Sequence, residues 1–252
     1  MRVLVTRPAV QAAAWVRSLQ ARGIDAVALP LIDIVPPADP AAVDAAWRSL
    51  DRHRLVVFVS PNAAEAFFHH RPDGAAWPDA ALAGSVGPGT TQALRRLGVP
   101  VAAIVEPAPD AEQFDSEALW RRLQDHAWGG ASVLIVRGDG GRDWLAETLR
   151  AHGAHVNFVS AYRRSAPALE SDARQRLAAA LEQPAAHLWF FSSSEAIDHL
   201  LQACPGRDWT AAQAIATHPR IARRARVGGF GRVEQTRPTL DAVVACIQSI
   251  AS

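Results

Sequence analysis

Polar turns recur along the sequence, and each one follows a short apolar run of the kind that forms a buried strand. Hydroxyls, arginines and the backbone N–H groups of such turns are suited to binding an anion. Ser, Thr and Asn also cap helices, so one such turn is explained equally well by a structural role. The recurrence of these turns favours binding. The candidate substrate-binding residues are Thr6, Arg7, Ser60, Asn62, Gly87, Thr90, Thr91, Arg137, Gly138, Ser192, Ser193, Ser194 and Arg220.

Tyr162 is the only tyrosine of the chain, and it follows a predicted strand that ends at residue 159. A phenol with the ordinary pKa of about 10 stays protonated at neutral pH, so it can donate a hydrogen bond to a reacting group. A tyrosine at such a boundary can equally pack its ring and leave its hydroxyl in water. Both interpretations are open, and Tyr162 is the candidate catalytic residue.

The charged residues narrow the classes of function. The 26 basic and 25 acidic residues give a formal net charge of +1, which indicates no nucleic-acid partner. All 26 basic residues are arginine, and the absence of lysine excludes Schiff-base chemistry and the lysine-dependent phosphate loop. Arginine presents a rigid fork of donors that matches a carboxylate or a phosphate. An anionic small molecule is therefore a suitable ligand.

Cys204 and Cys246 are too few and too far apart for a zinc site or a disulfide framework, so we expect free buried thiols and no metal. The first residues predict a short strand and contain no apolar leader. No stretch approaches the roughly 18 apolar residues of a membrane span. We expect a cytoplasmic protein with no membrane partner.

Short apolar runs alternate with amphipathic helical patterns, and this alternation predicts an α/β fold with parallel sheets. Two helices are predicted at residues 11–21 and 142–151, each ending near a glycine, Gly23 or Gly153. The predicted strands are 3–6, 26–29, 56–60, 82–86, 101–105, 133–137, 155–159, 187–191, 214–217 and 232–235.

An internal repeat relates the two halves of the chain. Residues 4–7 and Gly23 match residues 134–137 and Gly153, both 130 positions later. Residues 58–64 match residues 190–196, which places Ser192 opposite Ser60 at a separation of 132. A fainter match sets Ser85 opposite Ile215. Two similar α/β halves of about 125 residues follow, a usual domain size.

Two proline-rich breaks, residues 36–40 and 165–167, are the best candidates for linkers between domains. If both are crossings, the first domain is discontinuous. It consists of residues 1–35 plus 168–252, and the second domain consists of residues 41–164.

Seven segments carry motifs whose order and spacing are informative together: 5–8, 58–63, 86–91, 137–142, 153–163, 191–194 and 238–240. In this order they resemble the uroporphyrinogen-III synthase family over nearly the whole chain. The resemblance implies two flavodoxin-like parallel-sheet domains joined by a two-segment linker. It also implies a monomeric, cofactor-free lyase that acts on hydroxymethylbilane, an acidic linear tetrapyrrole, in haem biosynthesis.

The implied reaction cyclises the substrate. The hydroxyl on ring A departs, the substituted carbon of ring D attacks, and a spiro intermediate breaks and recloses with ring D inverted. Tyr162 resembles the family tyrosine that bonds the departing hydroxyl. Residues 217–220 depart from the family's pattern, so a carboxylate contact there rests on His218 or Arg220 rather than on a hydroxyl.

Two other classes compete with this interpretation. A non-catalytic two-domain binding protein would also close over an anionic small molecule. A two-lobed nucleotide-sugar transferase would need a clearer phosphate loop, and position 143 is Asp143 where the dinucleotide fingerprint requires its last glycine.

Overall fold

The structure, a computed structural model, describes residues 1–251. It divides into two compact units, one formed by Met1–Asp33 with the chain from Ser165 onward, the other by Ile34–Arg164. By this division the proline-rich segment 36–40 lies inside the second unit. The chain passes between the units at 33/34 and 164/165.

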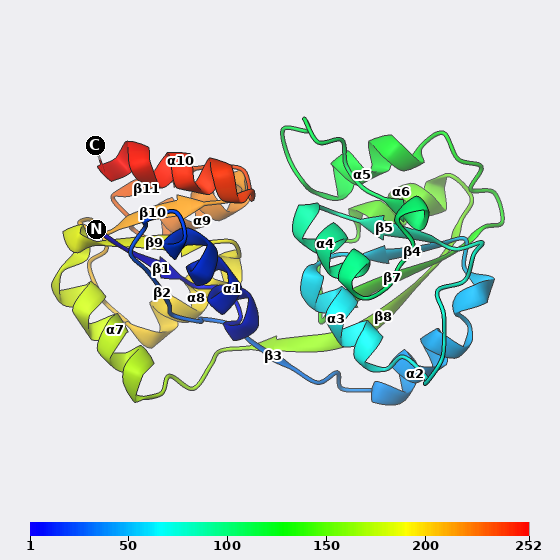
Figure 1. The fold of residues 1–252 in the computed structure, drawn as a ribbon, viewed down its shortest axis with the longest axis horizontal. Helices are drawn as coiled ribbons and strands as arrows, with labels where there is room; N and C mark the ends of the chain where they lie inside the picture. The colour runs from blue at the N-terminus through cyan, green and yellow to red at the C-terminus, as the bar shows by residue number, and fades with distance from the viewer. Residues whose placement is uncertain (252) are drawn as a thin grey trace. The chain divides into compact units, whose positions relative to one another are not determined.

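The first unit is built on a five-stranded parallel sheet in the order β11-β10-β9-β1-β2. Helices α1 and α10 cover one face, where Val5, Phe190 and Ile215 of the sheet pack against Leu19 and Val243 (Figure 1). The strands are β1 (Arg2–Val5), β2 (Ala26–Ala28), β9 (His187–Phe191), β10 (Gln213–Ala216) and β11 (Arg232–Gln235). The helices are α1 (Ala9–Gln20), α7 (Ser171–Glu182), α8 (Ser194–Ala203), α9 (Pro219–Val227) and α10 (Leu240–Ala251), with a 3-10 turn at Pro184–Ala186.

The second unit contains a six-stranded sheet in the order β3-β8-β7-β4-β5-β6. Its central strand β4 is buried along its whole length, as expected for a parallel strand with helices on both faces. The strands are β3 (Asp33–Val35), β4 (Leu55–Phe58), β5 (Leu82–Ser85), β6 (Ile104–Val105), β7 (Ser132–Gly138) and β8 (His155–Ser165).

Two hydrophobic cores flank this sheet. Helices α2, α3 and α4 cover one face, and α5 and α6 cover the other (Figure 1). Proline occupies the first position of α2, α3 and α4, where its missing N–H costs nothing. The helices are α2 (Pro40–Arg48), α3 (Pro61–His69), α4 (Pro88–Arg96), α5 (Ser116–Leu123) and α6 (Trp144–Ala151), with 3-10 turns at Leu50–Arg52 and Val101–Ala103.

The predicted α/β class with parallel sheets is confirmed. Three strand predictions were inaccurate. Strand β3 was not predicted, β8 continues to Ser165 instead of ending at residue 159, and most of the predicted strand 101–105 is a 3-10 turn. Cys204 and Cys246 are free thiols, as expected, but both are partly exposed rather than buried.

The sequence repeat does not coincide with the units. Apart from the short edge strand β3, which has no counterpart, the first repeat contains β1, β2, β4, β5 and β6, and the second contains β7 to β11. In space β1 pairs with β9, while β7 pairs with β4. With β3 set aside, each repeat contributes its first two strands to one unit and its last three to the other, and the two sheets have the same strand order.

Strand register corrects two of the sequence matches. Phe58 lies opposite Val136 and Ser85, whereas Phe191 lies opposite Ala216 and follows the Val5–Phe190 pair. Phe58 thus corresponds to Phe191, which makes Ser193 the counterpart of Ser60, and Ala216 the counterpart of Ser85. Both serines are N-caps, Ser60 of α3 and Ser193 of α8, which supports this correspondence.

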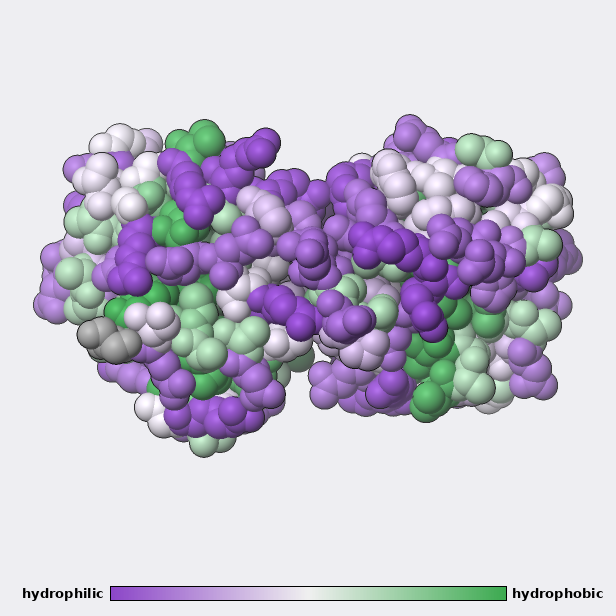
Figure 2. Space-filling view, turned by 90° about the horizontal axis from the view of Figure 1, so that it is seen from above, coloured by the Kyte–Doolittle hydropathy of each residue, from purple (hydrophilic) through white to green (hydrophobic). Residues whose placement is uncertain are grey.

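The surface view is a mosaic of hydrophilic residues with smaller hydrophobic areas (Figure 2). The most exposed large apolar side chains are Val10 and Val227, at 77% and 75%. Within the described chain, no helix is long and apolar enough to cross a membrane.

The exchange of strands predicts which fragments fold. Residues 33–165 contain every strand of the second sheet and should unfold cooperatively as an isolated fragment, measured by circular dichroism during urea titration. Residues 1–130 form one sequence repeat but lack β9 and β7, so they should show no cooperative transition. The opposite result would show that the sequence repeat, rather than the exchanged unit, is the folding unit.

Candidate functional site

Three of the predicted site residues, Ser60, Gly138 and Tyr162, meet at one end of the second sheet. Arg137 of β7 lies opposite Ser160 of β8, but Gly138 lies opposite Tyr162, so β8 carries one extra residue, a β-bulge at Ala161. The Tyr162 ring joins the core under α2, α3 and α4 and is only 2% exposed. Tyr162 therefore lies within a strand and not after one.

The Tyr162 hydroxyl lies 3.1 Å from Ser60 Oγ. Ser60 is the N-cap of α3, and its Oγ also accepts the N–H of Ala63 at 3.1 Å. Ser60 itself is partly exposed. The two hydroxyls form a pair in which one is almost fully buried and the other stands at the end of the sheet.

Gly138 is required by the same ring. A Cβ at this position would lie 2.8 Å from Tyr162 Cζ, closer than real Cβ contacts. Gly138 thus packs directly against the phenol.

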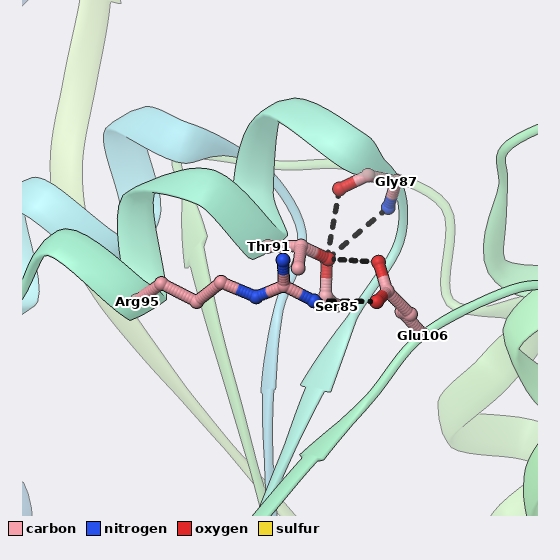
Figure 3. Close-up of polar contacts among 5 residues, drawn as sticks. All are labelled: Ser85, Gly87, Thr91, Arg95 and Glu106. Carbon is pink, nitrogen blue, oxygen red and sulfur yellow. Dashed lines mark hydrogen bonds and ion pairs between the residues drawn. The ribbon is translucent and has the colours of Figure 1, made fainter. Parts of the chain in front are cut away.

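The turn after β5 is held by a network of polar groups (Figure 3). Ser85 Oγ donates to the carbonyl of Gly87 at 2.9 Å and accepts its N–H at 3.3 Å. The Thr91 hydroxyl donates to Glu106 at 2.6 Å and lies 2.9 Å from Ser85 Oγ. Arg95 pairs with the second oxygen of Glu106 at 3.1 Å. Together these bonds hold both the N–H and the carbonyl of Gly87 in place.

This network changes what the turn can offer a ligand. Thr90 and Thr91 are 2% and 3% exposed, and both of their amides donate to the carbonyl of Gly87. The Thr91 hydroxyl is used by Glu106. A Cβ on Gly89 would lie 3.4 Å from Pro61 Cγ, so this turn packs beside the Ser60 turn. Thr90 and Thr91 are thus buried within the turn, and their hydrogen bonds hold its conformation.

Arg137 and Arg142 are neutralised within the second unit. Arg137 pairs with Asp143 at 2.6 Å and lies 3.9 Å over the ring of Phe158. Arg142 makes a two-pronged contact with Glu117 at 2.5 and 2.9 Å, and these bonds raise the pKa of its guanidinium.

Arg7 occupies the position equivalent to Arg137, 130 residues earlier, in a different environment. Its guanidinium lies 5.0 Å from the ring centre of Trp15 and 5.8 Å from that of Phe190. Its Nε is buried and has no hydrogen-bond partner within the described chain. Burial lowers the pKa of Arg7 to about 10. Arg7 as a residue is partly exposed, but a guanidinium whose Nε is buried without a partner is costly, and a ligand carboxylate would offset that cost.

The other candidates of the first unit divide into structural groups and groups near a helix start. Thr6 is 1% exposed and donates to the carbonyl of Phe190 at 2.8 Å, so its hydroxyl belongs to the fold. Ser193 Oγ accepts the N–H of Glu195, while Ser194 Oγ is buried without a partner in the described chain. Arg220 is exposed.

Ser85 and Glu106 were not among the predicted site residues, although the structure places both in the network around Gly87. The signal for both was present, because Ser85 lies in the last turn-facing part of the predicted strand 82–86 and Glu106 follows the predicted strand 101–105. The His218 ring caps α9 by accepting the N–H of Arg220 at 3.1 Å. Asn62 follows Ser60 and Pro61 at the start of α3, and Ser192 follows β9.

Parallel sheets with polar turns at their carboxyl ends, one of which carries the hydroxyl pair, define an open α/β protein, a class whose ligand sites lie at those ends. Within the described residues, no cluster of three metal-ligating side chains occurs. The family model described as "Uroporphyrinogen-III synthase HemD" matches residues 13–245. The chain belongs to the uroporphyrinogen-III synthase family.

Individual relatives agree with this assignment. The chain is 34% identical over 168 residues to the uroporphyrinogen-III synthase of Salmonella typhimurium, covering 66% of each chain. It is 30% identical over 176 residues to that of Chlorobaculum parvum, covering 68% of this chain and 67% of the relative. The fold is similar to the uroporphyrinogen-III synthetase of Helicobacter pylori, with a TM-score of 0.60 at 14% identity over 99% of this chain and all of the other. A Thermus thermophilus uroporphyrinogen III synthase gives a TM-score of 0.59 at 15% identity, over 100% of this chain and 98% of that one.

The contact between Gly138 and the phenol can be tested by one methyl group. Gly138→Ala should displace the Tyr162 ring and lower the free energy of unfolding by about 1–3 kcal/mol, measured in urea. Gly129→Ala is the matched control, because a Cβ there meets nothing within 4 Å. Equal stability of the two variants would contradict the tight packing of the ring on Gly138.

Proposed function

We propose that this protein is an active uroporphyrinogen-III synthase, a carbon–oxygen lyase that cyclises hydroxymethylbilane with loss of water and inversion of ring D. Family membership supports the activity. The observation that carries the proposal is the hydroxyl pair Ser60–Tyr162 at the carboxyl end of the second sheet. Loss of a hydroxyl needs a hydrogen-bond donor at the departing oxygen, and this pair supplies one.

The substrate's acidic side chains fit the rest of the inventory. Hydroxymethylbilane carries acetates and propionates, and carboxylates are the partners that arginine binds best. Arg7 is better prepared to bind a carboxylate than Arg137 or Arg142, because those two are already paired with Asp143 and Glu117. We expect Arg7 to bind one carboxylate of the substrate.

The binding-protein alternative explains the anion-binding turns but not the family assignment, which does not favour it. It also gives no reason for a buried phenol to meet a serine at the end of the sheet.

We extend the proposal to the architecture and the setting of the enzyme. The strand order of the first unit, counted within that unit, is 2-1-3-4-5, the order of flavodoxin-like domains. We propose that both units are such domains joined by two segments of chain, and that the enzyme works in the cytoplasm as a monomer without a cofactor. Size-exclusion chromatography with light scattering tests the oligomeric state.

The activity is tested by separating the products. Incubation of the protein with freshly generated hydroxymethylbilane should yield the type III isomer of uroporphyrinogen, because the enzyme must invert ring D before closure. The heat-denatured protein is the control, and it should leave only the spontaneous type I isomer. Type I alone from the native protein would refute the proposed function.

Arg7 should lower the stability of the fold and strengthen substrate binding. Its lowered pKa means that the folded state holds the Arg7 proton less tightly than the unfolded state does, so charged Arg7 destabilises the fold at every pH below about 10. Arg7→Met keeps apolar contact with Trp15 and Phe190, so the melting temperature should stay the same or rise. KM for hydroxymethylbilane should rise about tenfold or more, as for one lost bond to a charged group. Arg17→Met, on the exposed side of α1, is the control, and an unchanged KM in Arg7→Met would remove Arg7 from binding.

A further inference from the structure

The Ser60–Tyr162 pair contains two hydroxyl hydrogens and one hydrogen bond between them. One hydrogen is used in that bond, and the other points elsewhere. Which residue donates therefore decides which hydrogen is available to a substrate. Burial distinguishes the two cases, because Tyr162 is 2% exposed and Ser60 is partly exposed.

A buried hydroxyl needs an acceptor for its hydrogen. The acceptor in the structure within reach of the Tyr162 hydroxyl is Ser60 Oγ, at 3.1 Å. If Ser60 donated instead, the hydrogen of the more buried residue would be left over. If Tyr162 donates, the hydrogen left over belongs to the partly exposed serine.

The geometry of Ser60 Oγ agrees with the second case. A serine oxygen has two lone pairs and one hydrogen. One lone pair accepts the N–H of Ala63, and the other accepts the phenol. Its own hydrogen is then the single group left to point outward. Two donors on one oxygen also polarise its O–H bond, which makes it a better donor.

We propose that Ser60, and not Tyr162, donates the hydrogen bond to the departing hydroxyl of hydroxymethylbilane, and that Tyr162 is a positioning residue that acts through Ser60. The inference rests on the proposed function. It reverses the roles that the sequence alone indicates, where Tyr162 is the donor and Ser60 binds the substrate.

The step balances without a cofactor. The bond between the ring A methylene and its oxygen breaks, and its electron pair remains on oxygen. The pyrrole nitrogen supplies the pair that forms the new exocyclic double bond, and the proton lost from that nitrogen balances the proton with which the oxygen leaves as water. Ser60 stabilises the negative charge that develops on the oxygen. It stands at the N-terminus of α3, whose dipole favours negative charge.

The first experiment reads the direction of the hydrogen bond without measuring activity. The intensity ratio of the tyrosine doublet in the Raman spectrum distinguishes a phenol that donates from one that accepts. Tyr162 is the only tyrosine, so the doublet reports on it alone. The wild-type protein should show a donating phenol, and Ser60→Ala should abolish that signature. An accepting phenol in the wild-type protein would overturn the proposal.

The second experiment compares rates in the full chain. Ser60→Ala should lower kcat about 10²-fold or more, the range for a positioned donor, with KM little changed. Tyr162→Phe should lower kcat by only about tenfold, because Ser60 keeps its hydrogen. The double variant should match Ser60→Ala, since Tyr162 acts through Ser60. Ser60→Thr retains the hydroxyl and should recover most of the rate.

A matched control accounts for the helix cap. Asp39→Ala removes an N-cap bond of the same length, 3.1 Å to Ala42, from α2. It should lower stability about as much as Ser60→Ala and leave kcat unchanged. A Tyr162→Phe variant that is slower than Ser60→Ala would overturn the assignment. If the wild-type protein makes no type III isomer, the proposed function fails, while the Raman spectrum still decides the direction of the bond.

Discussion

The register shift between β7 and β8 decides where Tyr162 stands, and the candidate site depends on it. In a regular strand alternate residues share a face, so Val159 and Ala161 would share one and Tyr162 would turn to the opposite face. The bulge instead places all three in the core under α2, α3 and α4. From there the ring rests on Gly138 and the hydroxyl reaches Ser60. If the same sequence continued as a regular strand without the bulge, the phenol would point into the core under α5 and α6, away from the start of α3.

Buried hydroxyls need hydrogen-bond partners. This requirement separates the polar residues of both units into those used within the fold and those left for a ligand. Thr6 donates to a backbone carbonyl, and Thr91 and Ser85 are used to hold the Gly87 turn. These three are almost fully buried, and their bonds leave little for a ligand. The groups that remain for chemistry are those with an unused hydrogen or charge near the surface, chiefly Ser60 and Arg7. A hydroxyl at the end of a strand is therefore not by itself a binding group.

The sequence predicts the parallel α/β class, most strands and the ends of the sheet that carry the polar turns, because buried parallel strands read as short apolar runs. It does not predict β3, a three-residue edge strand beside a proline-rich segment, or the bulge at Ala161, since neither changes the apolar pattern. Spacing identified Ser60 and Gly138 as site residues but assigned both to the substrate. Their contacts with Tyr162 depend on strand register, which a single sequence does not show.

Because the repeats exchange strands, each turn site combines residues from both halves of the chain, and the two sites have diverged. Ser60 of the first repeat meets Tyr162 of the second, whereas the positions 130 and 131 residues before Tyr162 are Ile32 and Leu31, both buried and apolar. Ser193 therefore caps its helix without a phenol beside it. The network of Ser85, Thr91 and Glu106 has Ala216, Ala222 and Gln235 at the equivalent positions. The second unit thus holds the hydroxyl pair and a rigid turn, while the first unit holds the unpaired cation Arg7. Under the proposed mechanism, the duplicated fold separates the group that assists bond breaking from the group that attracts the acidic substrate.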